Sequence, residues 1–170
     1  TDYCGTFTAK DCGREVVVAG WVQRQRDLGA LIFVDLRDRT GIVQLAFDDT
    51  TDKEIFDKAF SARSEFVLMA SGEVRERSSK NMEIPTGEIE IFVDDLRVLA
   101  KSETTPFEIV ENCATSELTR LKYRYLDLRR PDLQKNILMR HKITKITRDY
   151  FDENGFIEIE TPMLIKSTPE

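Results

Sequence analysis

Residues 20–47 of the sequence read GWVQRQRDLGALIFVDLRDRTGIVQLAF. Three stretches of alternating side chains, residues 20–26, 31–37 and 42–47, are separated by residues 27–30 and 38–41, which are rich in Asp and Gly. Alternation with a period of two is typical of β-strands, and Asp and Gly tolerate the backbone angles of tight turns. The pattern therefore predicts three consecutive antiparallel strands.

The middle strand of this set separates its side chains into two faces. Ile32, Val34 and Leu36 can fill a core, whereas Phe33 and Asp35 share the opposite face. The neighbouring strands could complete that face with Trp21, Gln23, Gln25 and Gln44. An aromatic ring edged by amide and guanidinium groups suits unstacked nucleotide bases. The alternative is that Phe33 is an ordinary core residue and the arginines form a solvated face, and composition alone favours this alternative.

The next part of the chain extends the pattern to a complete fold. Residues 52–62 carry apolar side chains at helical spacing after an Asp- and Thr-rich N-cap signal, and residues 65–77 and 88–99 alternate as two further strands. Three strands, one helix and two strands is the order of the OB-fold, a five-stranded Greek-key barrel that commonly binds oligonucleotides on its second and third strands. We predict an all-β OB-fold domain over residues 1–103.

Residues 104–130 change in character and are predicted to be a linker and hinge. Ser, Thr and Glu dominate the first part, which contains Pro106. Residues 120–130 read RLKYRYLDLRR and combine basic with aromatic side chains. Two interpretations stay open for this segment: a hinge helix whose charges are solvated, or a phosphate-facing surface between two domains.

Residues 131–170 begin a second pattern. Pro131 suits the first position of a helix, apolar side chains then recur at steps of three and four, and Asn154 and Gly155 provide a helix end. The single histidine, His141, is assigned to the surface of this helix. Residues 156–160, FIEIE, alternate as a strand. Because one helix and one strand cannot close a core, we expect the truncated start of an α+β domain, and thus part of a larger protein.

Composition narrows the classes of function. The 170 residues carry a formal net charge of −6 and a pI near 5.0, which argues against general nucleic-acid coating but leaves room for a local basic patch. The three cysteines form no Cys-x-x-Cys pair, so neither a disulfide framework nor a zinc site is indicated. With no long apolar run and no signal-peptide pattern, we expect a cytoplasmic protein that does not bind a membrane.

Four segments, in order, resemble one known family. They are residues 20–44 (GWVQRQRDLGALIFVDLRDRTGIVQ), residues 85–91 (PTGEIEI), residues 120–131 (RLKYRYLDLRRP) and residues 155–170 (GFIEIETPMLIKSTPE). Together they resemble the bacterial-type aspartyl-tRNA synthetases. GFIEIETP resembles motif 1 of the class II synthetases, whereas RYLDLR and the barrel are shared with the asparaginyl and lysyl relatives. The RDLGALIFVDLRDR and LIKSTPE stretches resemble the aspartyl branch.

The resemblance implies an activity for the whole enzyme. Members of the family activate L-aspartate with ATP and Mg2+ to an aspartyl-adenylate, transfer it to tRNA(Asp) and form homodimers. The sequence contains neither motif 2 nor motif 3 of the class. We therefore expect this portion to bind the tRNA anticodon, to contain no catalytic residue or metal site, and not to catalyse aminoacylation or bind ATP and Mg2+ by itself.

The resemblance also assigns residues to anticodon binding. Phe33 resembles the residue that stacks on an anticodon base, Gln44 the one that reads the central uracil, and Glu90 the one that accepts from the first base. The positions of further contacts to anticodon bases or backbone are matched by Arg26, Arg77 and Asn81. The chemistry fits, because an amide can pair with uracil and a carboxylate can accept from guanine. A surface amide and a solvated strand charge are the alternatives for Gln44 and Glu90.

Three further residues carry expectations from the resemblance. Leu28 lies in the loop where some members carry His and charge both aspartate and asparagine tRNAs, and Leu resembles the discriminating kind. Pro162 matches motif 1, which forms the dimer interface, and Glu170 matches the residue near the amino group of bound L-aspartate. Two alternatives to an aspartate-tRNA ligase stay open: a free-standing OB-fold module that binds single-stranded nucleic acid, and an asparaginyl or lysyl relative.

Overall fold

The structure is a computed structural model that describes residues 1–167. The chain divides into two compact units, Thr1–Thr105 and Pro106–Glu170.

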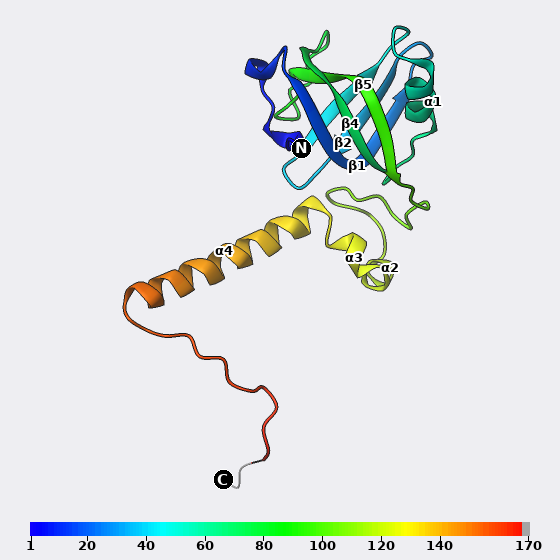
Figure 1. The fold of residues 1–170 in the computed structure, drawn as a ribbon. Helices are drawn as coiled ribbons and strands as arrows, with labels where there is room; N and C mark the ends of the chain where they lie inside the picture. The colour runs from blue at the N-terminus through cyan, green and yellow to red at the C-terminus, as the bar shows by residue number, and fades with distance from the viewer. Residues whose placement is uncertain (168–170) are drawn as a thin grey trace. The chain divides into compact units, whose positions relative to one another are not determined.

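The first unit is a closed barrel (Figure 1). Its elements are β1 (Glu15–Asp27), β2 (Ile32–Arg37), β3 (Ile42–Phe47), α1 (Lys53–Ser61), β4 (Val67–Glu76) and β5 (Ile89–Ala100). The strand order around the barrel is β1-β2-β3-β5-β4, in which β3 and β5 are parallel and the other neighbours antiparallel. The predicted OB-fold is thereby confirmed, with its helix between the third and fourth strands.

The alternation of β2 decides which side chains fill the barrel. Ile32, Val34 and Leu36 are completely buried, as predicted. The other strands add large buried side chains that include Phe47, Leu45, Leu68, Ile89 and Ile91, and α1 contributes Ala59. Burial of this apolar surface is the main stabilising term of the barrel.

The turn between β2 and β3 fastens the start of the chain to the barrel through Asp38. Its carboxylate accepts hydrogen bonds from the backbone N–H of Cys4 at 2.8 Å, from Thr40 N–H at 2.7 Å and from Gly41 N–H at 3.2 Å. Gly5 lies so close to this turn that an added Cβ would meet the carbonyl oxygen of Thr40 at 2.3 Å. Burial and the nearby Asp38 carboxylate raise the pKa of Cys4 to about 12, so this thiol stays protonated.

The second unit begins with two short helices. They are α2 (Glu117–Lys122) and α3 (Arg124–Asp127), and the side chains of Phe107, Ile109 and Leu126 form a small core with them. Much of the predicted linker, residues 104–130, therefore has structure and buried side chains of its own.

Buried charged side chains pair with one another in this region. Asp127 is 1% exposed and accepts from Arg124 Nη1 at 2.5 Å and from Arg130 Nη1 at 3.0 Å, while Arg120 Nη1 lies 3.8 Å away. Arg130 is also buried, and it donates from Nε to the carbonyl oxygen of Val110 at 3.2 Å. Arg120, Arg124 and Arg130 thus converge on one carboxylate, which the interpretation as a hinge helix with solvated charges did not anticipate.

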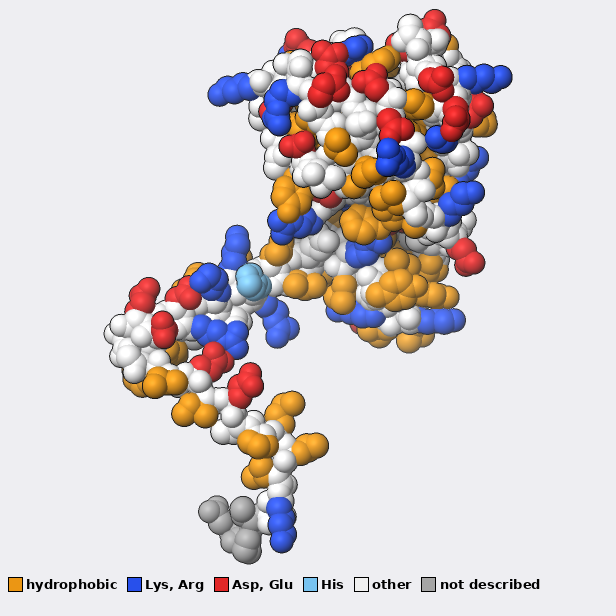
Figure 2. All heavy atoms as spheres, in the orientation of Figure 1, with side chains coloured by type: hydrophobic (Ala, Val, Ile, Leu, Met, Phe, Trp, Pro, Cys, Tyr) orange, Lys and Arg blue, Asp and Glu red, His pale blue; other side chains and the backbone are white. Residues whose placement is uncertain are grey.

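The last described element is a long helix, α4 (Pro131–Glu153). It begins at Pro131 and is followed by Gly155 with a φ of +81°, as the sequence predicts. Figure 2 shows apolar side chains on the surface of α4 and of the segment after it. The exposed apolar residues are Ile137, Leu138, Met139, Ile143, Ile146, Tyr150, Phe151, Phe156, Ile157, Ile159, Met163, Leu164 and Ile165.

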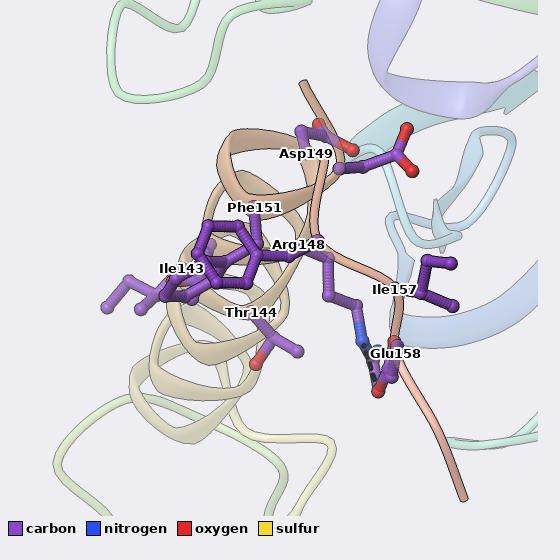
Figure 3. A pocket seen from close by; sticks show the side chains of 10 residues that line it. Ile143, Thr144, Arg148, Asp149, Phe151, Ile157 and Glu158 are labelled. Carbon is purple, nitrogen blue, oxygen red and sulfur yellow. Dashed lines mark hydrogen bonds and ion pairs between the residues drawn. The ribbon is translucent and has the colours of Figure 1, made fainter. Parts of the chain in front are cut away.

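The predicted strand at residues 156–160 is wrong for this structure, in which the segment forms no ladder. A strand needs a hydrogen-bonding partner, and the described part of the second unit holds no other strand. The segment instead folds back beside α4, where Arg148 Nη2 donates to Glu158 Oε1 at 2.9 Å (Figure 3). The rings of Phe151 and Phe156 meet edge to face, with centroids 5.4 Å apart.

Candidate nucleic-acid interface

Strand register places four polar side chains in one row across the outside of the barrel. Asp35 of β2 is the cross-strand partner of Gln44 of β3, and Glu90 of β5 is the partner of Arg75 of β4. The parallel pairing of β3 with β5 sets Gln44 beside Glu90. The row therefore reads Asp35, Gln44, Glu90, Arg75.

A second row runs one pleat further along and carries two aromatic rings. Phe33 of β2 pairs with Ala46 of β3, and Ala46 pairs with Phe92 of β5. Both rings are half-buried, so part of each ring reaches solvent. Ala46 separates the two rings in this row, and its side chain is only a methyl group.

A chain of hydrogen bonds joins the side chains that the sequence assigns to anticodon binding. Arg26 Nη2 donates to Asp35 Oδ1 at 3.0 Å and to Gln44 Oε1 at 2.9 Å. Gln44 Nε2 in turn donates to Glu90 Oε2 at 2.7 Å. The guanidinium of Arg26 lies 5.6 Å from the centre of the Phe33 ring. Phe33, Arg26, Gln44 and Glu90 are thus brought together as one cluster, here called the Gln44 cluster.

The structure differs from expectation in the exposure of Gln44. A base can pair only with an amide that it can reach, yet Gln44 is only 3% exposed. The reason is that both polar ends of the amide bind charged partners, the guanidinium at Oε1 and the carboxylate at Nε2. Such charge-assisted hydrogen bonds are stronger than those between neutral groups. Access of a base to this amide requires a covering side chain to move.

Arg77 and Asn81 lie in the connection between β4 and β5, outside the Gln44 cluster. Their backbone N–H groups donate to the carbonyl oxygens of Glu88 and Gly87, both at 2.9 Å. Asn81 Oδ1 accepts from the N–H of Glu83 at 2.9 Å, so this side chain shapes the loop. Gly87 is required here, because an added Cβ would lie 1.6 Å from the carbonyl oxygen of Asn81.

Leu28 lies in the loop between β1 and β2 and is 67% exposed. Its N–H donates to the carbonyl oxygen of Leu31 at 2.9 Å, and Gly29 takes a φ of +84° that closes the turn. The Leu28 side chain is therefore presented to solvent by a fixed loop.

Two family models match the chain. One is described as an OB-fold nucleic acid binding domain and matches residues 16–99, and the other as tRNA synthetases class II (D, K and N) and matches residues 116–170. An aspartate–tRNA(Asp/Asn) ligase of Thermoanaerobacter sp. (strain X514) is 58% identical over 100% of this chain and 29% of its own length. The aspartate–tRNA ligase of Ruminiclostridium cellulolyticum is 57% identical over 98% of this chain and 28% of its own length.

The chain thus matches aspartate–tRNA ligases along its whole length, and its residues 116–170 match the class II tRNA synthetases (D, K and N). Among solved structures, the asparaginyl-tRNA synthetase of Pyrococcus horikoshii with asparaginyl-adenylate matches with a TM-score of 0.83 and 28% identity, over 96% of this chain and 37% of that one. The chain spans less than a third of the length of the two curated relatives.

Two residues, Pro162 and Glu170, are assigned by the family resemblance to the catalytic domain, and both come after α4 in the sequence. Pro162 lies in the exposed segment that follows α4. Glu170 lies outside the described residues. Within residues 1–167, no group of three His, Cys, Asp or Glu side chains is arranged to hold a metal ion. Nor does any described helix have the length and apolar character needed to cross a membrane.

Sequence reasoning missed two residues of this face, Phe92 and Arg75, and gave no role to Asp35. The Arg75 guanidinium lies 4.2 Å from the centre of the Phe92 ring, a shorter distance than that between Arg26 and Phe33. A signal was present, because Phe92 follows Glu90 by two positions in a strand and therefore shares its face. The pairing of Arg75 with Glu90 could not be read before the strand order was known.

Proposed function

We propose that the protein containing this chain is an aspartate–tRNA ligase, which activates L-aspartate with ATP and transfers it to tRNA(Asp). The observation that supports this most directly is the Gln44 cluster, which includes the Phe33 ring, in a chain 58% identical to an aspartate–tRNA(Asp/Asn) ligase. Anticodon recognition is the part of this function that we assign to residues 1–105.

The proposed roles follow from the chemistry of each side chain. Phe33 stacks on an anticodon base, and Gln44 pairs with the central uracil through its amide. Glu90 accepts from the first base, while Arg26 and Arg77 supply positive charge to the RNA backbone. Because the whole chain carries a net charge of −6, this attraction is confined to one face. Asn81 contacts the anticodon from the loop between β4 and β5, a loop that its Oδ1 also shapes by accepting from the N–H of Glu83.

The catalytic steps lie beyond the described residues. ATP and Mg2+ would supply the activating chemistry in the whole enzyme. Within residues 1–167, no cluster of metal ligands is arranged to hold the ion. We place Glu170 near the amino group of bound L-aspartate. We also propose that the whole enzyme is a homodimer, with the exposed apolar side chains of α4 and the segment around Pro162 at the interface.

Aminoacylation by the whole protein tests this proposal. We expect aspartate, and neither asparagine nor lysine, to be attached to tRNA(Asp). Charging with asparagine or lysine instead would assign the protein to another branch of the group. The 170-residue chain should bind an anticodon stem-loop of tRNA(Asp) more tightly than an unrelated single-stranded RNA of equal length. Equal affinity for the two RNAs would favour a general single-strand binding module.

A second candidate function is charging of tRNA(Asn) with aspartate as well. The name of the Thermoanaerobacter relative, aspartate–tRNA(Asp/Asn) ligase, favours it. Against this second candidate, we propose that Leu28 makes the enzyme selective for tRNA(Asp). Its exposed side chain is presented to solvent by the β1–β2 loop. Charging of both tRNAs by the wild type and by Leu28→His distinguishes the two. Efficient charging of tRNA(Asn) by the wild type would refute the role given to Leu28.

A further inference from the structure

We propose that Glu90, assisted by Arg26, locks the Gln44 carboxamide in one orientation, and that this lock separates uracil from cytosine at the middle anticodon position. The inference rests on the proposed anticodon-binding function. It makes Glu90 and Arg26 positioning residues for Gln44, in addition to any contact of their own with RNA.

The lock follows from the kinds of groups that face the amide. Gln44 Nε2 donates to Glu90 Oε2 at 2.7 Å, and Gln44 Oε1 accepts from Arg26 Nη2 at 2.9 Å. A carboxylate can only accept hydrogen bonds and a guanidinium can only donate them. Turning the amide by half a rotation would set oxygen against the carboxylate and NH2 against the guanidinium. At 3% exposure Gln44 has little water to replace the two lost bonds, so only one orientation is stable.

The orientation matters because uracil and cytosine present opposite patterns in the same places. Uracil offers an N3–H donor beside its O4 acceptor, whereas cytosine offers an N3 acceptor beside its N4 amino donor. With one bond made at each end, the amide of Gln44 still has one N–H and one oxygen lone pair to offer. A freely turning amide could pair with either base. An amide held in one orientation meets one of them with two hydrogen bonds and the other with two mismatches.

The two positioning residues are not equivalent. The Arg26 guanidinium lies over the Phe33 ring, and its Nε is buried without a hydrogen-bond partner. A base that stacks on the same ring competes with the guanidinium for that place, so RNA binding removes or shifts the contact at Oε1. Glu90 holds the amide from the other end, on β5, and can keep its bond while the base is present. Glu90 therefore carries the greater part of the lock.

Binding of the 170-residue chain to two anticodon stem-loops tests the inference. The two RNAs are identical except for U or C at the middle position. We expect the wild type to prefer U by about tenfold or more, and Glu90→Gln to lose most of that preference, because a glutamine accepts or donates and satisfies either orientation of Gln44. Arg26→Gln should reduce the preference less. Glu15→Gln removes the same charge from an exposed position at the start of β1 and should leave the preference unchanged.

The outcomes separate this inference from the proposed function. If the wild type binds both RNAs equally, the anticodon-reading function itself fails. If the wild type prefers U and Glu90→Gln weakens both RNAs by the same factor, Glu90 only contacts RNA and the lock is refuted. Should Glu90→Gln not fold, NMR of the wild-type chain replaces it. Slow hydrogen exchange of the Gln44 side-chain NH2 then supports the lock, and exchange as fast as in an exposed glutamine overturns it.

Discussion

Arg37 Nη2 donates to both carboxylate oxygens of Glu65, at 2.9 Å and 3.1 Å, although Glu65 sits in left-handed backbone with a φ of +65°. The side chains of Arg37 and Glu65 are only 15% and 6% exposed. A non-glycine residue in this region of the backbone is uncommon, and surrounding structure must hold it there. The ion pair ties β2 to the residues just before β4.

Replacing Glu65 by alanine should destabilise the barrel strongly. The change leaves the Arg37 charge buried without its carboxylate, which typically costs about 3–5 kcal/mol in the free energy of unfolding. Asp95→Ala is the matched control, because it breaks the exposed Asp95–Arg97 pair and should cost no more than about 1 kcal/mol. Urea unfolding of the two variants measures the difference. Equal losses in the free energy of unfolding would mean that the buried Arg37–Glu65 pair stabilises the barrel no more than the exposed Asp95–Arg97 pair does.

The contribution of Asp38 should depend on pH. Burial raises the pKa of this carboxyl, but hydrogen bonds from Thr40, Cys4 and Gly41 outweigh burial and leave the pKa below its ordinary value. Because the folded pKa lies below the unfolded value of about 3.9, the carboxylate stabilises the fold above that value, and this stabilisation is lost as the pH falls through the folded pKa.

Asp38→Asn tests this dependence, since an amide nitrogen cannot accept from the Cys4 N–H. At pH 7 we expect the variant to be less stable than the wild type by about 1–3 kcal/mol. The difference should shrink as the pH falls below about 4, because the wild-type carboxyl then takes up a proton. Urea unfolding at several pH values measures it. A difference that stays constant down to pH values near 2 would contradict the assignment.

Local patterns account for the parts of the fold that the sequence predicts well. Alternation in residues 31–37 and the Asp- and Gly-rich turns determine β2 and its neighbours, and Pro131 and Gly155 mark the ends of α4. These signals act over a few residues. They suffice to predict the barrel and to place Phe33 and Gln44 on neighbouring strands.

The remaining features depend on partners far along the chain. Gln44 is buried because Arg26 and Glu90, 18 and 46 positions away, occupy its two ends. The segment before α4 is ordered by a bond from Arg130 to the carbonyl of Val110, which is 20 positions away. Neither pairing has a local signature. The prediction of a strand at residues 156–160 was wrong because a strand also needs a distant partner. The alternating pattern is local and does not show whether such a partner is present.

The two aromatic rings of the barrel face should contribute unequally to RNA binding. Phe33→Ala should weaken binding of the tRNA(Asp) anticodon stem-loop by about 1–3 kcal/mol, the usual cost of losing a base–aromatic stack. Phe92→Ala should weaken it less, because the Arg75 guanidinium lies only 4.2 Å from that ring and covers it more closely. Phe60→Ala, an exposed ring on α1, is the control and should have no effect. An unchanged affinity for Phe33→Ala would make Phe33 a structural residue of the barrel.

Asp127 should control the order of residues 106–130. Its carboxylate is 1% exposed and accepts from Arg124 and Arg130. Asp127→Ala therefore removes one of the two carboxylates that pair with the buried Arg130, whose Nη2 still donates to Asp132 Oδ2 at 2.6 Å. The expected loss is about 1–3 kcal/mol in the free energy of unfolding of this segment, the usual cost of leaving buried hydrogen-bonding groups without a partner.

Hydrogen exchange of the backbone amides in α2 and α3 measures this loss. In Asp127→Ala the amides should exchange faster by about tenfold or more, while those of β1 to β5 should be unchanged because the barrel is a separate unit. Glu117→Gln changes an exposed charge on α2 and should leave exchange close to that of the wild type. Unaltered protection in Asp127→Ala would show that apolar packing, and not the buried carboxylate, orders this segment.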